Sequence, residues 1–201
     1  GLKTLPVLML HRWDHFNFKN GIIINRLEQF QKEGLIKQIG CSVQTPLEAT
    51  EAVKSEIITF VQIPYNIIDY RWDNSAFIQQ VQSRSDIHIQ ARSSLLQGLL
   101  ILPPDDWPVY SDNAKDINKW LENETVNLNR SSLQDLCYSY IRQKEWINSI
   151  VIGVETPEQL TENMNMFTQN IMTSEESNYI QSSRPQIPEK LLNPATWNTD
   201  T

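Results

Sequence analysis

Apolar residues gather along this chain in short runs of strand length, and a longer stretch with helical spacing follows each run. Five runs rich in β-branched residues are expected to form strands, at Leu5–Leu10, Ile36–Cys41, Ile57–Ile63, Ile87–Ala91 and Ser149–Gly153. Strands this apolar need cover on both faces, and their alternation with helices is typical of a parallel sheet with crossover helices. The pattern therefore predicts an α/β fold with about five parallel strands.

Amphipathic stretches connect these strands. The first, Ile22–Glu33, places Ile23, Leu27 and Phe30 on one helical stripe. Further helices are predicted over Leu47–Val53 and Ala76–Val81, around Ile117–Leu121, and over Leu133–Trp146, where Ser131 and Gln134 would form a capping box. Each helix would return the chain for another parallel strand.

Two junctions between a strand and a helix share a pattern, at Thr45–Pro46 and Thr156–Pro157. In each, Thr is suited to cap the helix and Pro to be its first residue, with Glu48 or Gln159 completing a capping box. Free backbone N–H groups at such a helix start bind anions readily. An anion site and ordinary capping both fit this pattern.

The number of strands limits the architecture. A parallel sheet closes into a TIM-type (β/α)8 barrel with about eight strands, typically over about 250 residues. This chain has 201 residues and five strand runs. We therefore predict an incomplete TIM-type barrel that lacks its first three units, with an open five-stranded sheet as the alternative. Residues 1–201 would form one partial barrel domain, and residues 182–201 its C-terminal tail.

Charge and cysteine content narrow the choice of partners. Lys and Arg total 17 against 24 Asp and Glu, a net charge of −7, so no basic face is expected for nucleic acid or anionic lipid. A membrane-spanning helix needs about 20 consecutive apolar residues, and no apolar run of this chain is nearly that long. The first residues do not resemble a signal peptide. Cys41 and Cys137 form no Cys-x-x-Cys pair, which favours buried thiols and a cytoplasmic location.

Six strings of residues carry a resemblance to a known family. They are Leu10–Asp14 (LHRWD), Lys32–Ser42 (KEGLIKQIGCS), Val61–Asp69 (VQIPYNIID), Ala91–Leu100 (ARSSLLQGLL), Ile152–Asn163 (IGVETPEQLTEN) and Ile187–Pro194 (IPEKLLNP). Together and in this order they resemble the aldo-keto reductase family. The resemblance implies that the five strands are the fourth to the eighth of an eightfold β/α barrel, in agreement with the strand count.

The resemblance also implies a chemistry. Family members are oxidoreductases that transfer hydride between NADP or NAD and an aldehyde or ketone, here a sugar-related compound in one interpretation, without a metal. A Tyr donates the proton, a Lys lowers the pKa of that Tyr, an Asp pairs with the Lys, and a His orients the carbonyl. Only the His has a counterpart, His11. The other three belong to the missing N-terminal units, so the 201-residue piece alone is expected to be inactive.

Ten positions are implied to bind the nicotinamide cofactor. Ser42 and Gln62 would hold the carboxamide, although Val43 stands where many members have Asn, and Arg92 would stack on the nicotinamide ring. The pyrophosphate would lie along Ser93, Leu95, Gln97 and Gly98, and the adenosine end along Gly153, Gln159 and Asn163. The Lys, Ser and Arg with which relatives grip a 2′-phosphate are missing, and Glu155 disfavours one. Weak discrimination between NADPH and NADH is therefore predicted.

Other interpretations stay open at this point. His11 fits an ordinary loop histidine, Gln62 a polar residue satisfied inside a strand, and Arg92 a surface salt bridge. A polar substrate rim is suggested by Arg12, Asp14, Tyr65, Asn66 and Arg71. The functional alternatives to the oxidoreductase are a non-catalytic dinucleotide-binding or interaction module and an inactive fragment.

Overall fold

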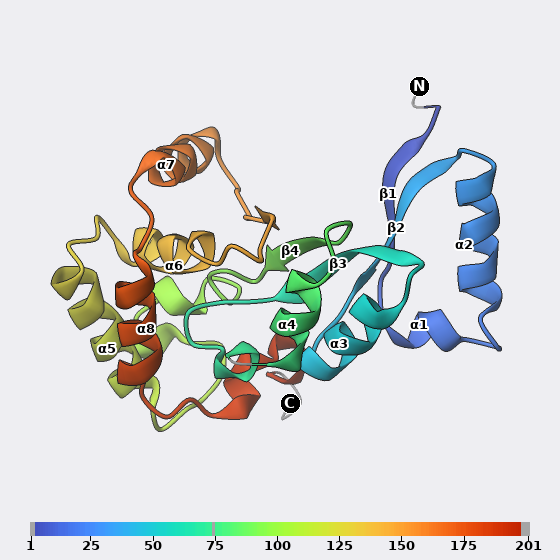
Figure 1. Ribbon diagram of the computed structural model, residues 1–201. Helices are drawn as coiled ribbons and strands as arrows, with labels where there is room; N and C mark the ends of the chain where they lie inside the picture. The colour runs from blue at the N-terminus through green and yellow to red at the C-terminus, as the bar shows by residue number, and fades with distance from the viewer. Residues whose placement is uncertain (1–2, 74, 198–201) are drawn as a thin grey trace. The chain divides into compact units, whose positions relative to one another are not determined.

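A single parallel sheet organises the strands in the computed structural model, which describes residues 3–73 and 75–197. Its order is β1-β2-β3-β4-β5, and each strand is hydrogen-bonded in parallel to the next (Figure 1). The strands are β1 (Leu5–Leu10), β2 (Ile36–Ser42), β3 (Ile58–Pro64), β4 (His88–Arg92) and β5 (Ser149–Ile150). The predicted α/β class is confirmed. The predicted length of the last strand is wrong, because the chain leaves the sheet after Ile150.

Helices occupy the connections between strands and most of the chain after β4. They are α1 (Asp14–Asn17), α2 (Ile22–Lys32), α3 (Pro46–Lys54), α4 (Ala76–Gln82), α5 (Ala114–Asn127), α6 (Leu133–Arg142), α7 (Pro157–Thr168) and α8 (Ser174–Ser183). Short 3₁₀ helices lie at Tyr70–Trp72, Leu99–Ile101, Pro104–Asp106, Glu189–Leu192 and Pro194–Thr196. Helix α8 was not predicted, because it contributes few apolar side chains and buries only Ser177 and Ile180.

The chain divides into two compact units. The sheet unit comprises Gly1–Pro64, Asn74–Arg92 and Trp146–Ile150, and it contains all the strands and helices α1 to α4. The helical unit comprises Tyr65–Asp73, Ser93–Glu145 and Val151–Thr201, and it contains α5 to α8. The single domain with a tail over residues 182–201 stays a prediction.

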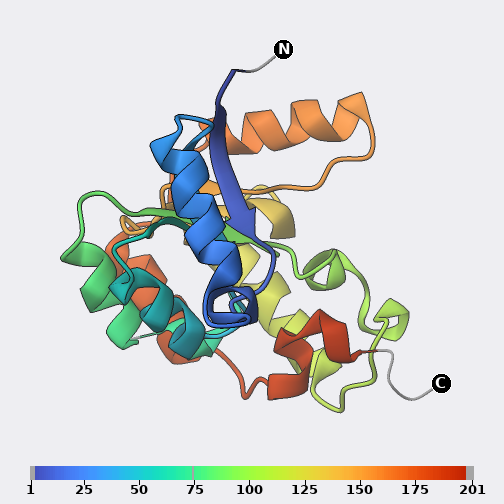
Figure 2. The same ribbon diagram turned by 90° about the vertical axis from the view of Figure 1, so that its right-hand side faces the viewer.

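One face of the sheet carries the core of the sheet unit. Side chains alternate between the two faces of a strand, and on this face Ile39, Cys41, Val61, Ile63 and Ile89 are completely buried. Helix α2 lies against β2, and Figure 2 shows it running alongside β1, while α3 lies against β3. The buried residues of α2 are Ile24 and Leu27. On the predicted stripe, Leu27 is buried, while Ile23 and Phe30 are half-buried.

Side-chain caps begin four of the α-helices in the described part of the chain, α3, α6, α7 and α8. Thr45 and Glu48 form the predicted capping box of α3, with both reciprocal hydrogen bonds present. At α6 the predicted box of Ser131 and Gln134 is wrong, because the helix begins one residue later. Ser132 Oγ accepts the N–H of Asp135 there, at 3.1 Å.

An ion-pair cluster holds together three segments of the helical unit. Arg184 donates to the carboxylate of Asp73 at 2.6 Å, to the Ile67 carbonyl at 2.9 Å and to the Tyr140 hydroxyl at 3.1 Å. Next to it, the ring of Tyr65 stacks on that of Tyr140. Burial raises the pKa of both phenols, which therefore stay neutral. Arg184 acts as a structural crosslink here.

The suggested polar rim is wrong at two of its members. Tyr65 and Asn66 are each 1% exposed inside the helical unit, and so they cannot line an open pocket. A third member, Arg71, donates two hydrogen bonds to Asp69. These polar side chains satisfy one another within the fold.

Gly40 lets β2 and β3 approach closely. A Cβ at this position would lie 2.7 Å from the Phe60 carbonyl oxygen and 2.9 Å from Cγ of Met9. Backbone atoms cannot retreat without distorting the ladder, so Gly is required here for reasons of space. The strand register shifts at the same point, between Ile39 and Gly40.

Replacing Gly40 with Ala should destabilise the protein by about 1–3 kcal/mol, because the new methyl group would overlap backbone and Met9. The measurement is urea unfolding of both proteins. Gly153→Ala is the control, since a Cβ there meets nothing within 4 Å. Equal effects of the two substitutions would contradict the steric explanation.

Both thiols are buried, as predicted. Cys41 and Cys137 are completely buried, and desolvation raises the pKa of each from 9.0 to about 12. The folded chain therefore keeps protons that the unfolded chain loses above pH 9. Stability linked to the thiols is fully present below pH 9 and is lost as the pH rises toward 12.

Cys137→Ala should make the stability less sensitive to alkali. At pH 8 the wild type should be the more stable protein, because Ala leaves a cavity in the core. Above pH 9 that difference in the free energy of unfolding should shrink by about 1.4 kcal/mol per pH unit. The reason is that the Cys137 thiol loses its proton in the unfolded wild type and keeps it in the folded protein. Unfolding at pH 8, 9.5 and 10.5 tests this, and a difference that does not change with pH would contradict it.

Candidate cofactor site

A row of polar side chains crosses the sheet unit near the carboxyl ends of its strands. The register pairs Ser42 with Gln62, and Gln62 with Gln90. Ser42 Oγ donates to Gln62 Oε1 at 3.2 Å, and Gln62 Nε2 donates to Gln90 Oε1 at 2.8 Å. Gln90 Nε2 in turn donates to Ser149 Oγ at 3.3 Å, and that hydroxyl lies 2.8 Å from Nε2 of His88. We call these five residues the polar row.

The polar row fixes the orientation of the Gln62 amide. The hydrogen bonds of this amide to Ser42 and Gln90 use one of its two N–H groups and one lone pair of its carbonyl oxygen. The amide therefore keeps a second N–H and a second lone pair. A flat carboxamide can pair with that remaining donor and acceptor. Both sequence interpretations of Gln62 are compatible with this geometry, because the side chain is satisfied by its neighbours and still has capacity for a ligand.

Sequence reasoning missed Gln90. Its signal lies in the alternation of the strand His88–Arg92, in which residues 88 and 90 share a face with each other and, through the register, with Gln62. In the same run, His88 stacks on the Phe60 ring with a centroid distance of 4.5 Å. Burial lowers the pKa of this imidazole, which favours its neutral form.

His11 and Arg92 lie at strand ends of the same unit. His11 is exposed and directly follows Leu10, whose partner in β2 is Cys41. Position 11 therefore comes level with Ser42. Arg92 ends β4, is half-buried, and donates from Nη2 to the Val43 carbonyl at 3.1 Å. Desolvation lowers the pKa of its guanidinium.

The remaining predicted cofactor residues meet in one pocket of the helical unit. This pocket has a volume of about 820 Å³. The predicted residues among those that line it are Ser93, Leu95, Gln97, Gly98, Gly153, Gln159 and Asn163. Gln134 and Tyr138 of α6 also line it. We call it the α7 pocket, because Gln159, Glu162, Asn163 and Met166 line it from one face of α7.

The loop after β4 forms another wall of the α7 pocket through unusual backbone geometry. Ser93, Leu96 and Gln97 have φ values of 59°, 48° and 55°, and Gly98 follows at 87°. Left-handed backbone costs of order 1–3 kcal/mol at a residue other than Gly and persists only where its surroundings impose it. Complete burial of Leu96, Leu99 and Leu100 provides that support.

The two Thr-Pro junctions behave as ordinary caps. At α7, Thr156 Oγ1 accepts the N–H of Gln159, and Gln159 Oε1 accepts the N–H of Glu155 at 2.7 Å. The predicted box at α7 is therefore only half right, because the Gln159 side chain binds the residue before the cap. At α3, Glu48 accepts the backbone N–H groups of Gln44 and Thr45. The side chains consume donors that an anion would need.

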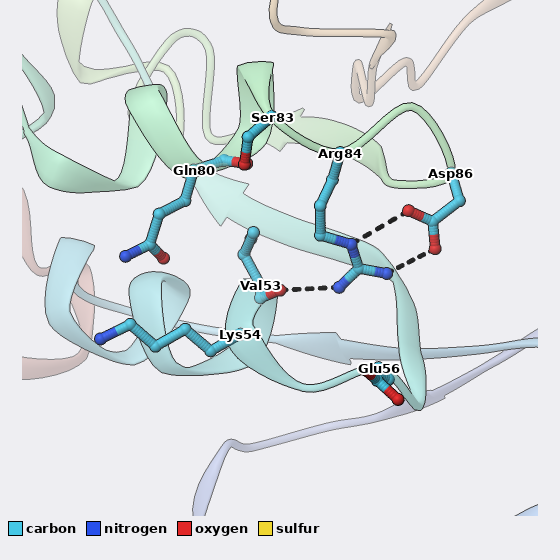
Figure 3. Close-up of a pocket in the computed structure, with 7 residues that line it drawn as sticks. All are labelled: Val53, Lys54, Glu56, Gln80, Ser83, Arg84 and Asp86. Carbon is cyan, nitrogen blue, oxygen red and sulfur yellow. Dashed lines mark hydrogen bonds and ion pairs between the residues drawn. The ribbon is translucent and has the colours of Figure 1, made fainter.

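A second pocket, of about 510 Å³, lies between α3 and α4 (Figure 3). Arg84 lines this pocket, and its guanidinium donates to the carbonyls of Val53 at 2.6 Å and Ser55 at 2.9 Å. The same guanidinium also donates to the carboxylate of Asp86. The guanidinium of Arg84 thus satisfies the carbonyls where α3 ends. None of the predicted site residues lines this pocket.

Metal-binding clusters and membrane-spanning helices are both absent from residues 3–73 and 75–197. In that part of the chain no three or more His, Cys, Asp or Glu side chains are grouped so that they could hold a metal ion. No helix in the same ranges is long and apolar enough to cross a membrane.

Comparisons with known proteins give the family. The model of the aldo/keto reductase family matches residues 1–184. The chain belongs to this family.

Individual relatives are distant in sequence and similar in fold. An uncharacterized oxidoreductase of Bacillus subtilis (strain 168), YqkF, is 23% identical over 171 residues, which are 81% of this chain and 55% of that protein. The aldo-keto reductase AKR11C1 of Bacillus halodurans, solved in its holo form, superposes with a TM-score of 0.77 at 20% identity, over 95% of this chain and 63% of the other. The glycerol dehydrogenase AKR11B4 of Gluconobacter oxydans superposes with a TM-score of 0.67 at 14% identity, over 93% of this chain and 62% of the other.

These matches confirm the predicted partial barrel of the aldo-keto reductase type. The chain spans between 55% and 63% of the length of these three relatives.

Gln90→Leu should destabilise the protein by about 1–3 kcal/mol, because it removes the acceptor of the Gln62 Nε2 hydrogen bond and one hydrogen bond of Ser149 from the polar row. Gln79→Leu, on the exposed part of α4, is the matched control and should change stability by less than about 0.5 kcal/mol. Urea unfolding measures both. If Gln90→Leu matches the control, the row does not stabilise the sheet unit.

Proposed function

We propose that this chain is the dinucleotide-binding part of an NAD(P)-dependent oxidoreductase that transfers hydride between the cofactor and an aldehyde or ketone. One observation carries the proposal. The α7 pocket gathers residues from two strand-to-helix connections about sixty positions apart in the chain, and they include most of the predicted cofactor residues.

The α7 pocket suits the pyrophosphate and adenosine end of a dinucleotide. Its volume of about 820 Å³ falls within the range typical of small-molecule sites. Ser93, Gln97 and Gln159 are polar residues of its lining, and their side chains can bind phosphate oxygens or ribose hydroxyls. Gly98, whose backbone is left-handed, has open space where a Cβ would stand and so lets a ligand approach the backbone.

The nicotinamide end is assigned to residues of the sheet unit. Ser42 and Gln62 are proposed to pair with the carboxamide, and the guanidinium plane of Arg92 to stack on the ring. A bound nicotinamide supplies the hydride. An N–H of His11 is proposed to donate to the substrate carbonyl oxygen, which polarises the carbonyl toward attack.

Proton transfer needs a group that this chain is not proposed to provide. Tyr138 lines the α7 pocket, but burial raises the pKa of its phenol to about 12, so that it is a weak acid at neutral pH. Tyr65 and Tyr140 are enclosed in the ion-pair cluster of the helical unit. We therefore propose that turnover requires the Tyr, Lys and Asp of the family pattern, and that this chain alone binds cofactor without turning over.

A non-catalytic dinucleotide-binding module is the second candidate. It is favoured by the same pocket, which gathers seven of the predicted cofactor residues, and by the raised pKa of Tyr138 in its lining. Binding without turnover is expected of both candidates for the 201-residue chain. Supplying the missing units separates them, since only the oxidoreductase would then reduce a carbonyl. The substrate is left at aldehyde or ketone, because Tyr65 and Asn66, which suggested a sugar, are buried.

NADH should bind to the chain and quench the fluorescence of its tryptophans. Asn163→Ala should weaken binding by about 1 kcal/mol, roughly fivefold, because Asn163 lines the α7 pocket and is 8% exposed. Asn165→Ala is the matched control, since Asn165 is exposed on the same helix and does not line the pocket. No quenching at millimolar NADH would contradict the proposal.

A further inference from the structure

The polar row ends at a histidine. Gln62 and Gln90 each accept one hydrogen bond and donate another within the row. Ser42 donates at one end, and at the other end Ser149 Oγ lies 2.8 Å from Nε2 of His88. Of the five members, His88 is the one whose side chain gains or loses a proton near neutral pH. Its protonation state therefore decides which hydrogen bond closes the row.

The direction of the row matches a neutral His88. Each amide N–H in the row points from Ser42 toward His88, because Gln62 donates to Gln90 and Gln90 donates to Ser149. The Ser149 hydroxyl can continue this direction by donating its own proton to Nε2 of His88, an atom that accepts only when it carries no proton. Burial lowers the pKa of the imidazole and so favours its neutral form at neutral pH.

The same side chains can form the row in the opposite direction. A protonated Nε2 of His88 donates to Ser149 Oγ, and the Ser149 proton then needs a new acceptor. Gln90 provides one when its amide turns over, and the Gln62 amide then turns over as well and donates to Ser42. Every hydrogen bond of the row is kept, because the oxygen and the NH2 group of an amide are nearly alike in size. Without this reversal the half-buried Ser149 hydroxyl would lose its acceptor, which costs free energy.

No charged side chain in the described part of the chain controls His88. Its ring stacks on Phe60 of β3, and neither β3 nor β5, the two strands beside β4, contains an ionisable side chain. Close to His88 in the chain, Asp86 pairs with Arg84, and Arg92 donates to a backbone carbonyl. Burial is the cause of the lowered pKa of His88, and no ionisable group among the described residues contributes to it. A proton from solvent is therefore the event that changes the state of this half-buried ring.

We propose that His88 is a positioning residue, whose protonation state sets the direction of the polar row and thereby the way in which the Gln62 amide is turned. Turning this amide exchanges the places of its remaining N–H and its remaining lone pair. A carboxamide ligand that pairs with both would therefore bind the two states with different affinity. The effect on a ligand rests on the proposed function, whereas the reversal of the row is a property of the sheet unit alone.

The test of the reversal is NMR spectroscopy of the full chain without ligand, in which the side-chain amides of Gln62 and Gln90 and the ring of His88 are followed as the pH falls from 8 to 5.5. Both amides should shift with the midpoint of His88, below its ordinary pKa of 6.5. Ser149→Ala removes the link between ring and amides, so that His88 should still titrate while the shift of the Gln62 amide falls severalfold. His15→Gln is the matched control, because His15 lies in α1 and outside the row, and it should leave the titration unchanged.

The effect on a ligand is measured by titration with NADH and with ADP-ribose, which lacks the nicotinamide, at pH 8 and pH 6. The ratio of the two affinities should change by about threefold or more between these pH values in the wild type, since about 0.7 kcal/mol corresponds to the loss of part of one hydrogen bond. The ratio should be independent of pH in Ser149→Ala. ADP-ribose thus controls for every effect of pH on the rest of the dinucleotide.

Each other outcome has a definite meaning. A Gln62 amide that does not follow the titration of His88 overturns the inference and leaves the proposed function standing. An undiminished shift in Ser149→Ala also overturns it, since the imidazolium would then act on the amide through its electric field and not through the row. If neither NADH nor ADP-ribose binds the wild type, the proposed function fails, and the spectra still decide whether His88 sets the direction of the row.

Discussion

The close approach of β2 and β3 at Gly40 is the constraint on which the sheet unit depends. With no side chain at this position, β2 comes close to Phe60 and the register is set. That register places Ser42 opposite Gln62, and Gln62 opposite Gln90. A slip of one residue would turn every side chain of the strand to the other face, and it would move Ser42 into the apolar core. The polar row is therefore a consequence of backbone packing as much as of the polar residues themselves.

In the helical unit, the main constraint is the irregular loop after β4, which forms one wall of the α7 pocket. Left-handed backbone at Leu96 and Gln97 is unfavourable for residues with a Cβ, yet the chain places them next to each other. The loop keeps this shape because Leu96, Leu99 and Leu100 are buried beneath it. Apolar burial thus offsets the strain, and the pocket wall is fixed before any ligand arrives, which lowers the entropic cost of binding.

The sequence predicted the strands well, because β-branched runs signal strands strongly. It located β1 to β4 to within one residue at either end, and it placed Cys41 and Cys137 in the core. The prediction of the capping residue of α6 failed, because two neighbouring residues can cap this helix with little difference in free energy. Ser131 and Ser132 are both competent caps, and the ion pair of Asp135 with Arg130 accompanies the later start.

The candidate site was predictable in part and for a definite reason. Family strings identify positions in a loop, such as Ser93 to Gly98, but they do not report whether a polar residue faces inward. Tyr65 and Asn66 therefore looked like a rim and proved to be buried, while Gln90 looked like an ordinary strand residue and proved to link Gln62 to Ser149. Burial and side-chain pairing depend on contacts between distant parts of the chain, which local pattern does not encode.

Binding and proton transfer are separable in this architecture. In barrels of this kind the residues of the site come from the ends of several strands, so that different βα units contribute different functions. The α7 pocket is lined by residues 93 to 166 of this chain, and its backbone is supported by buried leucines of the same unit. The cofactor affinity that we propose should therefore survive without a proton donor, since the groups that line the pocket do not depend on the pKa of a catalytic phenol.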